Sequence, residues 1–479
     1  MSPDALIPCE TVPPYTLPLT IEQFEAALRT GHGRAWQHAV DCGVADRLDA
    51  VVYACMHNLA YDAQCEGDRA DWMLALVEAA GVTNLVTPLL LQAGNEPPDQ
   101  DEGFWHAVQR CRVMLELAKR GEDAARALLY QSFRPNGETM DLIGCAEILE
   151  LDGADGLIFV CQKLGQWIAQ DASRLVDDQP LWKFDERAQP GVAARLLKSV
   201  RWNDPDIARY LDAVSAQSDF NTSTANTDLE PGAAPSRPRR LYKNLDSFRF
   251  DDAIADQRMQ AIESRSADDV IDWVRAAPEE AIGGWLRSWG RRAPEQYLMK
   301  VADALADETH PPRLCKFLLV FQRRAIPIVT DALLRLAEHP TPDVRWLLNY
   351  VLSHVADPRV RELALRCLTP ERMLESSLLL FRSNLKPGDA ETIERALFLP
   401  DDPEGRHGII LDLLKLFEKQ FSPESARLML FAYEHSPCGN CRVRATKVLA
   451  EIGAVPEWLA EECRFDAMEE LRERFAKET

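Results

Sequence analysis

The chain has 479 residues, and it lacks long apolar runs, signal-peptide features and dense cysteines. No stretch approaches the roughly 18 consecutive apolar residues that suggest a membrane-spanning helix. The first residues, MSPDALIPCETVPPY, contain neither a basic n-region nor an apolar h-region. The 12 cysteines are too sparse for a disulfide scaffold. These absences predict a cytoplasmic protein with reduced thiols.

The sequence also lacks the short motifs of the commonest enzyme classes. It contains no Walker loop, no G-x-G-x-x-G after a strand, no G-x-S-x-G and no H-E-x-x-H. These absences remove the usual nucleotide-binding, hydrolase and zinc-protease interpretations, although they leave other catalysis open. We therefore predict no catalytic, cofactor-binding or metal-binding residues, and no cofactor.

Positive charge is scarce as well. The chain carries 54 basic and 76 acidic residues, a net charge of −22, and its N-terminal half is the more acidic one. Binding to phosphate backbones and to anionic lipid surfaces usually needs a basic excess. We therefore expect neither nucleic acid nor a membrane as a partner.

What the C-terminal half does contain is a regular series of prolines. Several follow a capping residue and precede an acid, as in Thr341-Pro342-Asp343, Thr369-Pro370-Glu371 and Ser422-Pro423-Glu424. Proline at the first helical position loses no hydrogen bond, and acids there meet the positive end of the helix dipole. Each site therefore predicts a helix start. The prolines recur every 12 to 20 residues: Pro278, Pro294, Pro312, Pro327, Pro342, Pro358, Pro370, Pro387, Pro403, Pro423, Pro437 and Pro456.

Between these starts, apolar residues recur at intervals of three and four. Ile410, Leu413, Leu414 and Phe417 form one such helical face. Helices of about a dozen residues with short connectors imply antiparallel pairs of roughly 30–40 residues, the period of helical solenoids.

A weaker version of this period marks the N-terminal half. Gly43, Gly81 and Gly121 lie about 40 residues apart, and each is followed by an apolar helical pattern, so each glycine is predicted to end a helix. A tryptophan stands near the start of each preceding helix, and we expect all three to pack in the core or between repeats: Trp36, Trp72 and Trp105.

Composition divides the chain into four segments. Residues 215–244 are rich in Ser, Thr, Asn and Pro without an apolar period, which predicts a flexible linker that trypsin cuts first near Arg237–Arg240. The basic cluster there is either a solvated hinge or a docking motif for an acidic surface. We therefore predict an irregular segment at 1–19, an N-terminal helical-repeat block at 20–214, the linker, and a C-terminal block at 245–479.

The C-terminal half resembles the HEAT-repeat (armadillo-like) family of α-solenoids. The resemblance is good over about residues 265–479 and loose over 20–215, and it is carried by Asp343-Val344-Arg345, Asp357-Pro358 with Val360-Arg361, and Arg442-Val443-Arg444-Ala445. It implies an all-α, HEAT-like solenoid of antiparallel helix pairs, interrupted by the linker. In that family, Asp and Arg residues form a ladder between neighbouring repeats, and most members are scaffolds or adaptors.

Enzymatic branches of the family can be compared with the sequence. HEAT-like iron hydroxylases use paired His-Glu dipeptides, and none of the nine histidines here is followed by Glu. HEAT-like DNA glycosylases need a basic concave face, which the net charge of −22 disfavours. Chromophore lyases with such repeats offer no motif specific enough to test.

The sharpest local pattern is a histidine and cysteine cluster near the C-terminus. His435, Cys438 and Cys441 are each three residues apart, and Cys463 follows 22 residues later. A C-x2-C pair with a third Cys and a His could complete a tetrahedral zinc site, and the pair alone could be redox-active. No second C-x-x-C accompanies it, so we expect structural thiols and no metal.

Two acidic clusters are further candidates. Asp62, Glu66 and Arg69 would share one face of an unbroken helix beside His57 and could do acid–base chemistry, or they form an exposed face with an internal ion pair. Asn58, Tyr61, Cys65 and Trp72 accompany them. The second cluster is expected to cap and solvate helix ends rather than bind a cation, and it comprises Asp141, Glu147, Glu150, Asp152 and Asp155.

These patterns predict a cytoplasmic adaptor or scaffold that binds another protein along the concave face of a solenoid. The acidic charge favours a partner with a basic surface. The alternative is an enzyme or enzyme subunit whose acidic groove acts on a small or cationic substrate. The sequence leaves the partner and the oligomeric state open.

Overall fold

The computed structural model describes residues 11–96, 103–136, 141–171, 177–224 and 260–476, with only the backbone described at 217–224. The chain divides into two compact units: an N-terminal unit, Leu17–Phe250, and a C-terminal unit, Asp251–Thr479 with Met1–Thr16. Within the described residues nearly all regular structure is helical, which confirms the all-α prediction. None of the described helices is long and apolar enough to cross a membrane.

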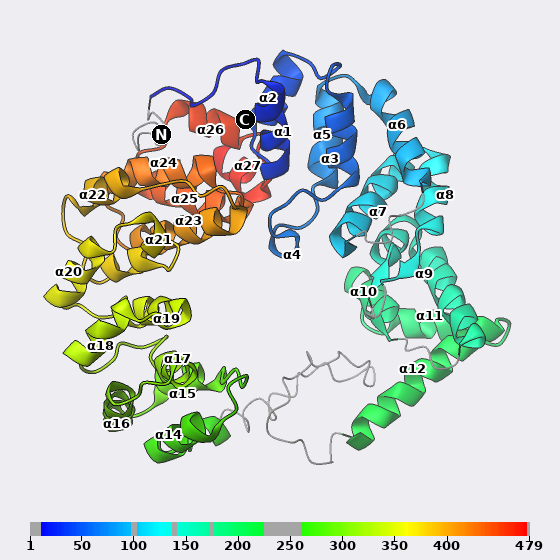
Figure 1. Cartoon of the computed structure of the whole chain (residues 1–479). Helices are drawn as coiled ribbons and strands as arrows, with labels where there is room; N and C mark the ends of the chain where they lie inside the picture. Colours follow the sequence, from blue (N-terminus) through cyan, green and yellow to red (C-terminus); the bar gives the residue numbers. More distant parts are fainter. Residues whose placement is uncertain (1–10, 97–102, 137–140, 172–176, 225–259, 477–479) are drawn as a thin grey trace. The chain divides into compact units, whose positions relative to one another are not determined.

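The N-terminal unit consists of helices and one pair of very short strands (Figure 1). The strands β1 and β2 pair antiparallel, with Arg134 opposite Ile143. The elements are α1 (Ile21–Thr30), α2 (Arg34–Asp41), α3 (Leu48–Met56), α4 (Ala63–Glu66), α5 (Ala70–Ala79), α6 (Thr83–Asn95), α7 (Phe104–Lys119), α8 (Asp123–Gln131), β1 (Arg134–Pro135), β2 (Leu142–Ile143), α9 (Cys145–Gln170), α10 (Gln179–Arg187), α11 (Val192–Val200) and α12 (Pro205–Thr224).

Glycines end helices in this unit as predicted. Gly43, Gly81 and Gly121 all have positive φ, at 79°, 68° and 96°, directly after α2, α5 and α7. A left-handed residue there stops the helix and turns the chain back, and only glycine adopts it without strain. The tryptophan prediction holds for Trp72, which is 5% exposed, but not for Trp105, which is 36% exposed.

Helices α9 and α12 pack closely. A Cβ on Gly165 of α9 would lie 2.0 Å from the carbonyl oxygen of Asp206 in the first turn of α12. The absence of a side chain therefore permits the contact. Helix α12 continues to Thr224, so residues 215–224 of the predicted linker are helical, because neither Gly nor Pro interrupts this stretch. The rest of the predicted linker, 225–244 with Arg237–Arg240, lies outside the described residues.

The C-terminal unit is a succession of short helices. Its elements are α14 (Ala267–Ala276), α15 (Trp285–Arg292), α16 (Glu295–Ala306), α17 (Pro311–Val320), α18 (Asp331–Arg335), η2 (Leu336–Glu338), α19 (Pro342–Leu352), α20 (Pro358–Arg366), α21 (Pro370–Met373), η3 (Ser377–Phe381), α22 (Asp389–Ala396), α23 (Pro403–Phe417), η4 (Pro423–Ser425), α24 (Ala426–His435), α25 (Gly439–Glu451), α26 (Glu457–Cys463) and α27 (Glu469–Phe475).

Proline marks the start of many of these helices, as predicted. Pro342, Pro358 and Pro403 are the first residues of α19, α20 and α23. The side chains of Asp357 and Asp402 cap α20 and α23, whereas the predicted cap residue Thr341 makes no such hydrogen bond. At these three starts the helix begins at the proline, and a side-chain cap is present only where the residue before the proline is Asp.

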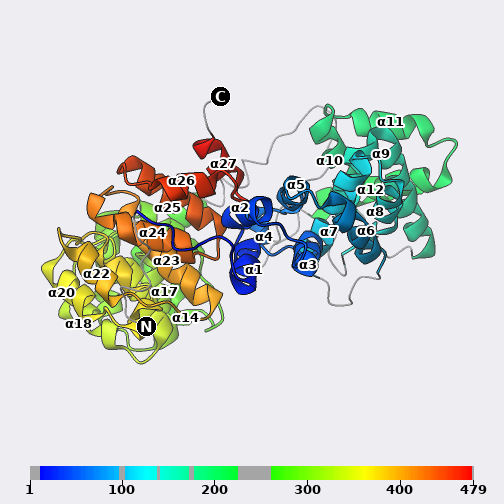
Figure 2. The ribbon, with the colours of Figure 1, turned by 90° about the horizontal axis from the view of Figure 1, so that it is seen from above.

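One set of helices forms a continuous row within the C-terminal unit. Consecutive members α15, α17, α19, η3, α23 and α25 contact one another, and we call them the helix row. Figures 1 and 2 show α18, α20 and α22 on one side of this unit and α17 and α23 on the other. The predicted apolar faces are buried between these layers, including Ile410, Leu413 and Phe417.

Ion pairs join segments about one helix pair apart. Arg345 pairs with Glu375, Arg361 with Asp389, Arg444 with Glu418, and Arg442 with Asp466. The partners are separated by 24 to 30 residues. The bridging arginines are those that suggested a ladder, and two of their partners are Asp, but Asp357 of the quoted pattern instead caps α20 and pairs with Arg359.

Candidate functional site

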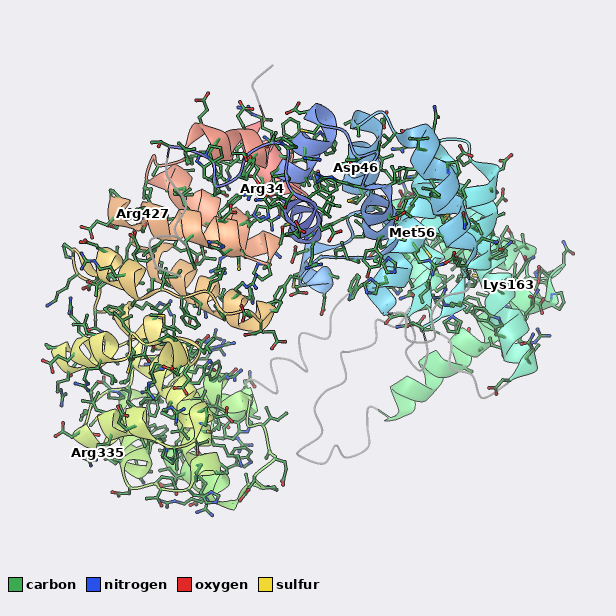
Figure 3. All side chains as sticks on the ribbon, turned by 45° about the horizontal axis from the view of Figure 1, so that its top comes forward. Arg34, Asp46, Met56, Lys163, Arg335 and Arg427 are labelled. Atoms are coloured by element: carbon green, nitrogen blue, oxygen red, sulfur yellow. The ribbon has the colours of Figure 1, made fainter. Side chains whose placement is uncertain are left out.

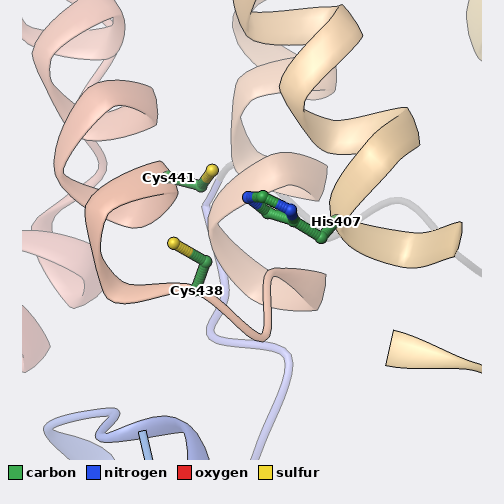
Figure 4. A group of neighbouring side chains, drawn as sticks. All are labelled: His407, Cys438 and Cys441. Atoms are coloured by element: carbon green, nitrogen blue, oxygen red, sulfur yellow. The ribbon is translucent and has the colours of Figure 1, made fainter. Parts of the chain in front are cut away.

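Three side chains with metal-ligand chemistry converge in the C-terminal unit. A nitrogen of His407 and the Sγ atoms of Cys438 and Cys441 all lie within 4.8 Å of one another. Figure 4 shows the imidazole from α23 facing both sulfurs at the start of α25. Among the described residues this is the one group of three or more His, Cys, Asp or Glu side chains that meets this spacing. We call it the thiol–imidazole cluster.

The local sequence explains how the cluster forms. Asp402 and Pro403 start α23, which places His407 in its second turn. Cys438 is the N-cap residue of α25, and Cys441 lies in the first turn of that helix. Because α23 and α25 are packed neighbours in the helix row, their N-terminal turns bring the imidazole to the thiols. Both thiols are buried, while His407 is half-buried.

Ser436 fixes the loop that carries Cys438. Its hydroxyl donates to the carbonyl oxygen of Cys438 at 2.9 Å and accepts from the Cys438 N–H at 3.1 Å. Ser436 is only 1% exposed, so water competes little with these bonds. These two hydrogen bonds fix the backbone of Cys438 and so limit where its side chain can lie.

The pKa values of the two thiols are shifted in opposite directions. A hydrogen bond from the Cys441 thiol, and a second from His407, lower the pKa of Cys438 below its ordinary value against the effect of burial. The interaction with Cys438 and burial raise the pKa of Cys441 above its ordinary range. The pair therefore holds one thiolate readily, as expected for close thiols at a helix N-terminus.

The other two residues of the sequence pattern do not join the cluster. His435 ends α24 and Cys463 ends α26, as the helix pattern predicts. The His435 ring packs against Phe431 at a centroid distance of 4.7 Å, and Cys463 Sγ lies 3.8 Å from the Tyr433 hydroxyl in the core. The sequence pattern therefore indicated the wrong histidine as the neighbour of the two thiols of the cluster. His407 is distant from them in the chain, and only helix packing brings it to them.

The predicted unbroken, exposed helical face in the N-terminal unit is wrong, but the predicted internal ion pair is present. Helix α4 ends at Glu66, Gly67 follows with a φ of 78°, and Arg69 is the N-cap residue of α5, so no unbroken helix joins Asp62 to Arg69. Glu66 and Arg69 instead form a buried ion pair with an O–N distance of 3.0 Å and side chains 1% and 5% exposed. Their role is structural.

Arg69 also ties two helices together. Its guanidinium donates to the carbonyl oxygens of Arg29 at 2.6 Å and Thr30 at 3.3 Å, which end α1. Asp62 caps α4 by accepting from the Cys65 N–H. His57 stacks on Tyr53 at 4.0 Å and bonds its carbonyl oxygen at 2.9 Å. These contacts account for the pattern through packing and capping.

The second acidic cluster separates into different environments. Glu150 accepts from Arg112 at 2.7 Å, Lys119 at 2.6 Å and Arg187 at 2.6 Å. These three cations lower the pKa of Glu150 to about 2, although burial opposes them. Burial raises the pKa of Glu147 instead. The prediction that these acids cap and solvate helix ends is therefore wrong for Glu150, which joins α7, α9 and α10.

Neither of two small cavities in the described part of the chain, one in each unit, is lined by residues of the thiol–imidazole cluster. One, of about 220 Å³, is bounded by α16 and α18 and is lined by Asp303, Glu308 and Arg335 among mostly apolar residues. Figure 3 labels Arg335 on the ribbon. The other, of about 330 Å³, lies near the ends of α6 and α8 and includes Arg110, which donates to the Glu96 carbonyl at 3.1 Å. Both are at or below the small end of typical ligand sites of about 300–1,000 Å³.

In comparisons with known proteins, no family model, no curated protein and no solved structure matches this chain.

Proposed function

We propose that the protein is an adaptor or scaffold that binds another protein along the C-terminal unit, arranged as a HEAT-like solenoid. The continuous helix row carries this proposal, because consecutive members contact one another over residues 285–451. Stacked helices of this kind present an extended surface without needing a deep pocket. The lack of catalytic motifs in the sequence and the small cavities also favour a binding role.

An aromatic patch on the row is the proposed contact site. Trp346 and Tyr350 of α19 have ring centroids 4.6 Å apart, and Lys415 of α23 places its Nζ 4.9 Å from the centre of the Tyr350 ring. The Lys415 Nζ also donates to the Tyr350 hydroxyl at 2.8 Å. All three side chains are half-buried, so they are held in place yet accessible. Aromatic residues of this kind often dominate binding energy.

The charge of the chain favours a partner with a basic surface. Asp343 and Glu404 are exposed acids in the first turns of α19 and α23, on the helix row. Binding should therefore weaken as salt rises, because surface charges are screened beyond a Debye length of about 8 Å at physiological salt.

The experiment is crosslinking and mass spectrometry in the native host, followed by affinity measurements with the purified partner. Trp346→Ala on the row should weaken binding, whereas Leu365→Ala on the exposed face of α20 should not. Asp343→Lys with Glu404→Lys should reduce the salt dependence. Equal effects of Trp346→Ala and Leu365→Ala, with both variants folded by circular dichroism, would place binding elsewhere and reject this proposal.

A further inference from the structure

The thiol–imidazole cluster brings together donors that one metal ion can use. Tetrahedral zinc has Zn–S bonds of about 2.3 Å and Zn–N bonds of about 2.0 Å, so its ligand atoms lie roughly 3.5–3.8 Å apart. The Cys438 and Cys441 sulfurs and a His407 nitrogen are already within 4.8 Å of one another. Side-chain rotations that move these atoms by about an ångström are enough to bring them to the spacing of zinc ligands. We propose that these three residues bind a zinc ion.

The donor set selects the class of metal. Two sulfurs and one imidazole suit zinc and related thiophilic ions, whereas Mg²⁺ and Ca²⁺ prefer oxygen donors. A disulfide between Cys438 and Cys441 is the competing use of the pair; there the imidazole would only tune thiol reactivity, whereas a metal ion uses all three side chains as ligands. The convergence of His407 from a separate helix therefore favours metal binding.

The surroundings support an anionic metal-binding pair. Both cysteines lie at the N-terminus of α25, where the helix dipole stabilises thiolates. Arg444, which pairs with Glu418 at 2.8 Å, adds a nearby positive charge that interacts with both sulfurs. Ser436 holds the Cys438 backbone through two hydrogen bonds. Binding would release to solvent whatever protons the thiols still carry.

Three protein ligands leave one position of a tetrahedral ion for water or another small ligand. The ion would also join the first turns of α23 and α25, two neighbours in the helix row. Because the folded chain presents the site and the unfolded chain does not, metal binding should raise the free energy of unfolding of the C-terminal unit. This proposal does not depend on the proposed adaptor function.

The test is a titration of metal-stripped, reduced full-length protein with Co²⁺, followed by competition with Zn²⁺. We expect the visible d–d bands of tetrahedral cobalt with sulfur-to-metal charge transfer, at one ion per chain. Cys438→Ser, Cys441→Ser and His407→Ala should each weaken binding at least about 100-fold. Ser436→Ala should weaken it by about 10–100-fold, the usual effect of losing a hydrogen bond that positions a ligand.

Matched controls decide which histidine and which thiols matter. His435→Ala and Cys65→Ser should leave the cobalt spectrum unchanged, since His435 is outside the cluster and Cys65 is exposed. Zinc should raise the Tm of the wild type but not of folded His407→Ala. A spectrum that survives in His407→Ala and is lost in His435→Ala would overturn the assignment. So would a wild-type protein that binds no cobalt when reduced, or that forms a Cys438–Cys441 disulfide in air while zinc is present.

Discussion

The two units mark and connect their helices in different ways. The N-terminal unit ends helices with left-handed glycines such as Gly43 and Gly81, whereas the C-terminal unit starts them with prolines such as Pro342 and Pro403. Proline at the first position and glycine after the last use the two ends of a helix differently. A sequence can therefore mark helix boundaries from either end. Each unit favours one device, although Pro205 starts α12 and Gly453, with a φ of 67°, follows α25.

Their ion pairs do not divide between the units in this way. In the N-terminal unit, Glu66 and Arg69 pair across three residues, whereas Glu150 pairs with cations that lie 31 to 38 residues away. In the C-terminal unit, Arg442 and Asp466 pair across 24 residues with both side chains fully buried. Local pairs fix a turn, whereas distant pairs fix how one segment packs on the next. Removing each kind of pair tests this difference.

The largest effect is expected from Arg442. Replacing it by Ala leaves Asp466 buried without its charge partner and should lower the free energy of unfolding by about 3–5 kcal/mol. The double variant Arg442→Met, Asp466→Leu should recover most of that loss, because it buries no charge. Urea denaturation gives the free energies, and hydrogen exchange should locate the loss in α25 and α26. A loss below about 1 kcal/mol would contradict this role.

Close helix contacts should matter similarly in both units. A Cβ on Gly290 of α15 would lie 1.8 Å from the Val320 carbonyl oxygen, and one on Gly165 would lie 2.0 Å from that of Asp206. Gly290→Ala and Gly165→Ala should each cost about 1–3 kcal/mol or more, because helices must move apart. Gly408→Ala is the control: nothing lies within 4 Å, so it should stabilise α23 by up to about 1 kcal/mol. Thermal unfolding of the three variants checks the order.

The Glu150 cluster should give the N-terminal unit an acid-dependent component of stability. The pKa of Glu150 falls from 4.5 to about 2 on folding, so its stabilisation is present above pH 4.5 and is lost as pH falls towards 2. After allowance for the partly exposed cations, it is roughly 1–2 kcal/mol. Glu150→Gln should remove it at neutral pH and flatten the pH dependence in this range. Unchanged pH dependence in that variant would assign acid sensitivity to other groups.

The smallest effect is expected from exposed bridging pairs. Lys300 and Asp268 lie 2.7 Å apart, but their side chains are 54% and 67% exposed. Asp268→Asn should change the free energy of unfolding by less than about 1 kcal/mol, because solvent screens the pair. Comparison with Arg442→Ala by the same denaturation assay separates burial from spacing. Similar losses in both variants would show that spacing, not burial, sets the contribution.

The sequence predicted helix positions better than side-chain encounters. Pro342 and Gly81 act through backbone geometry, which depends on the residue and its immediate neighbours, so their positions were predictable. The break in the helix between Glu66 and Arg69 was not predicted, although Gly67 is a signal for it in the sequence. The polar composition of residues 215–224 predicts a linker, but the absence of Gly and Pro there permits the helix that forms.

The thiol–imidazole cluster shows where sequence reasoning stops. Cys438 and Cys441 are three residues apart at the start of one helix, so their proximity follows from spacing alone. His407 joins them only because α23 packs on α25, and one sequence carries no direct sign of that register. The useful signal was the helix pairing itself: residues in the N-terminal turns of two successive row members can meet. A comparison of the residues in such turns indicates His407, and not His435, as the third side chain of the cluster.

The spacing of the bridging ion pairs also bears on how the C-terminal unit emerges from the ribosome. Its cross-segment partners lie 24 to 30 residues apart, from Arg442–Asp466 to Arg345–Glu375. At synthesis rates of about 5–20 residues per second, the second partner follows the first by roughly 1–6 s. Arg345 and Arg361 can therefore acquire their partners before the last helices of the unit are synthesised. Arg361 would meet Asp389 while the residues of α25 were still untranslated.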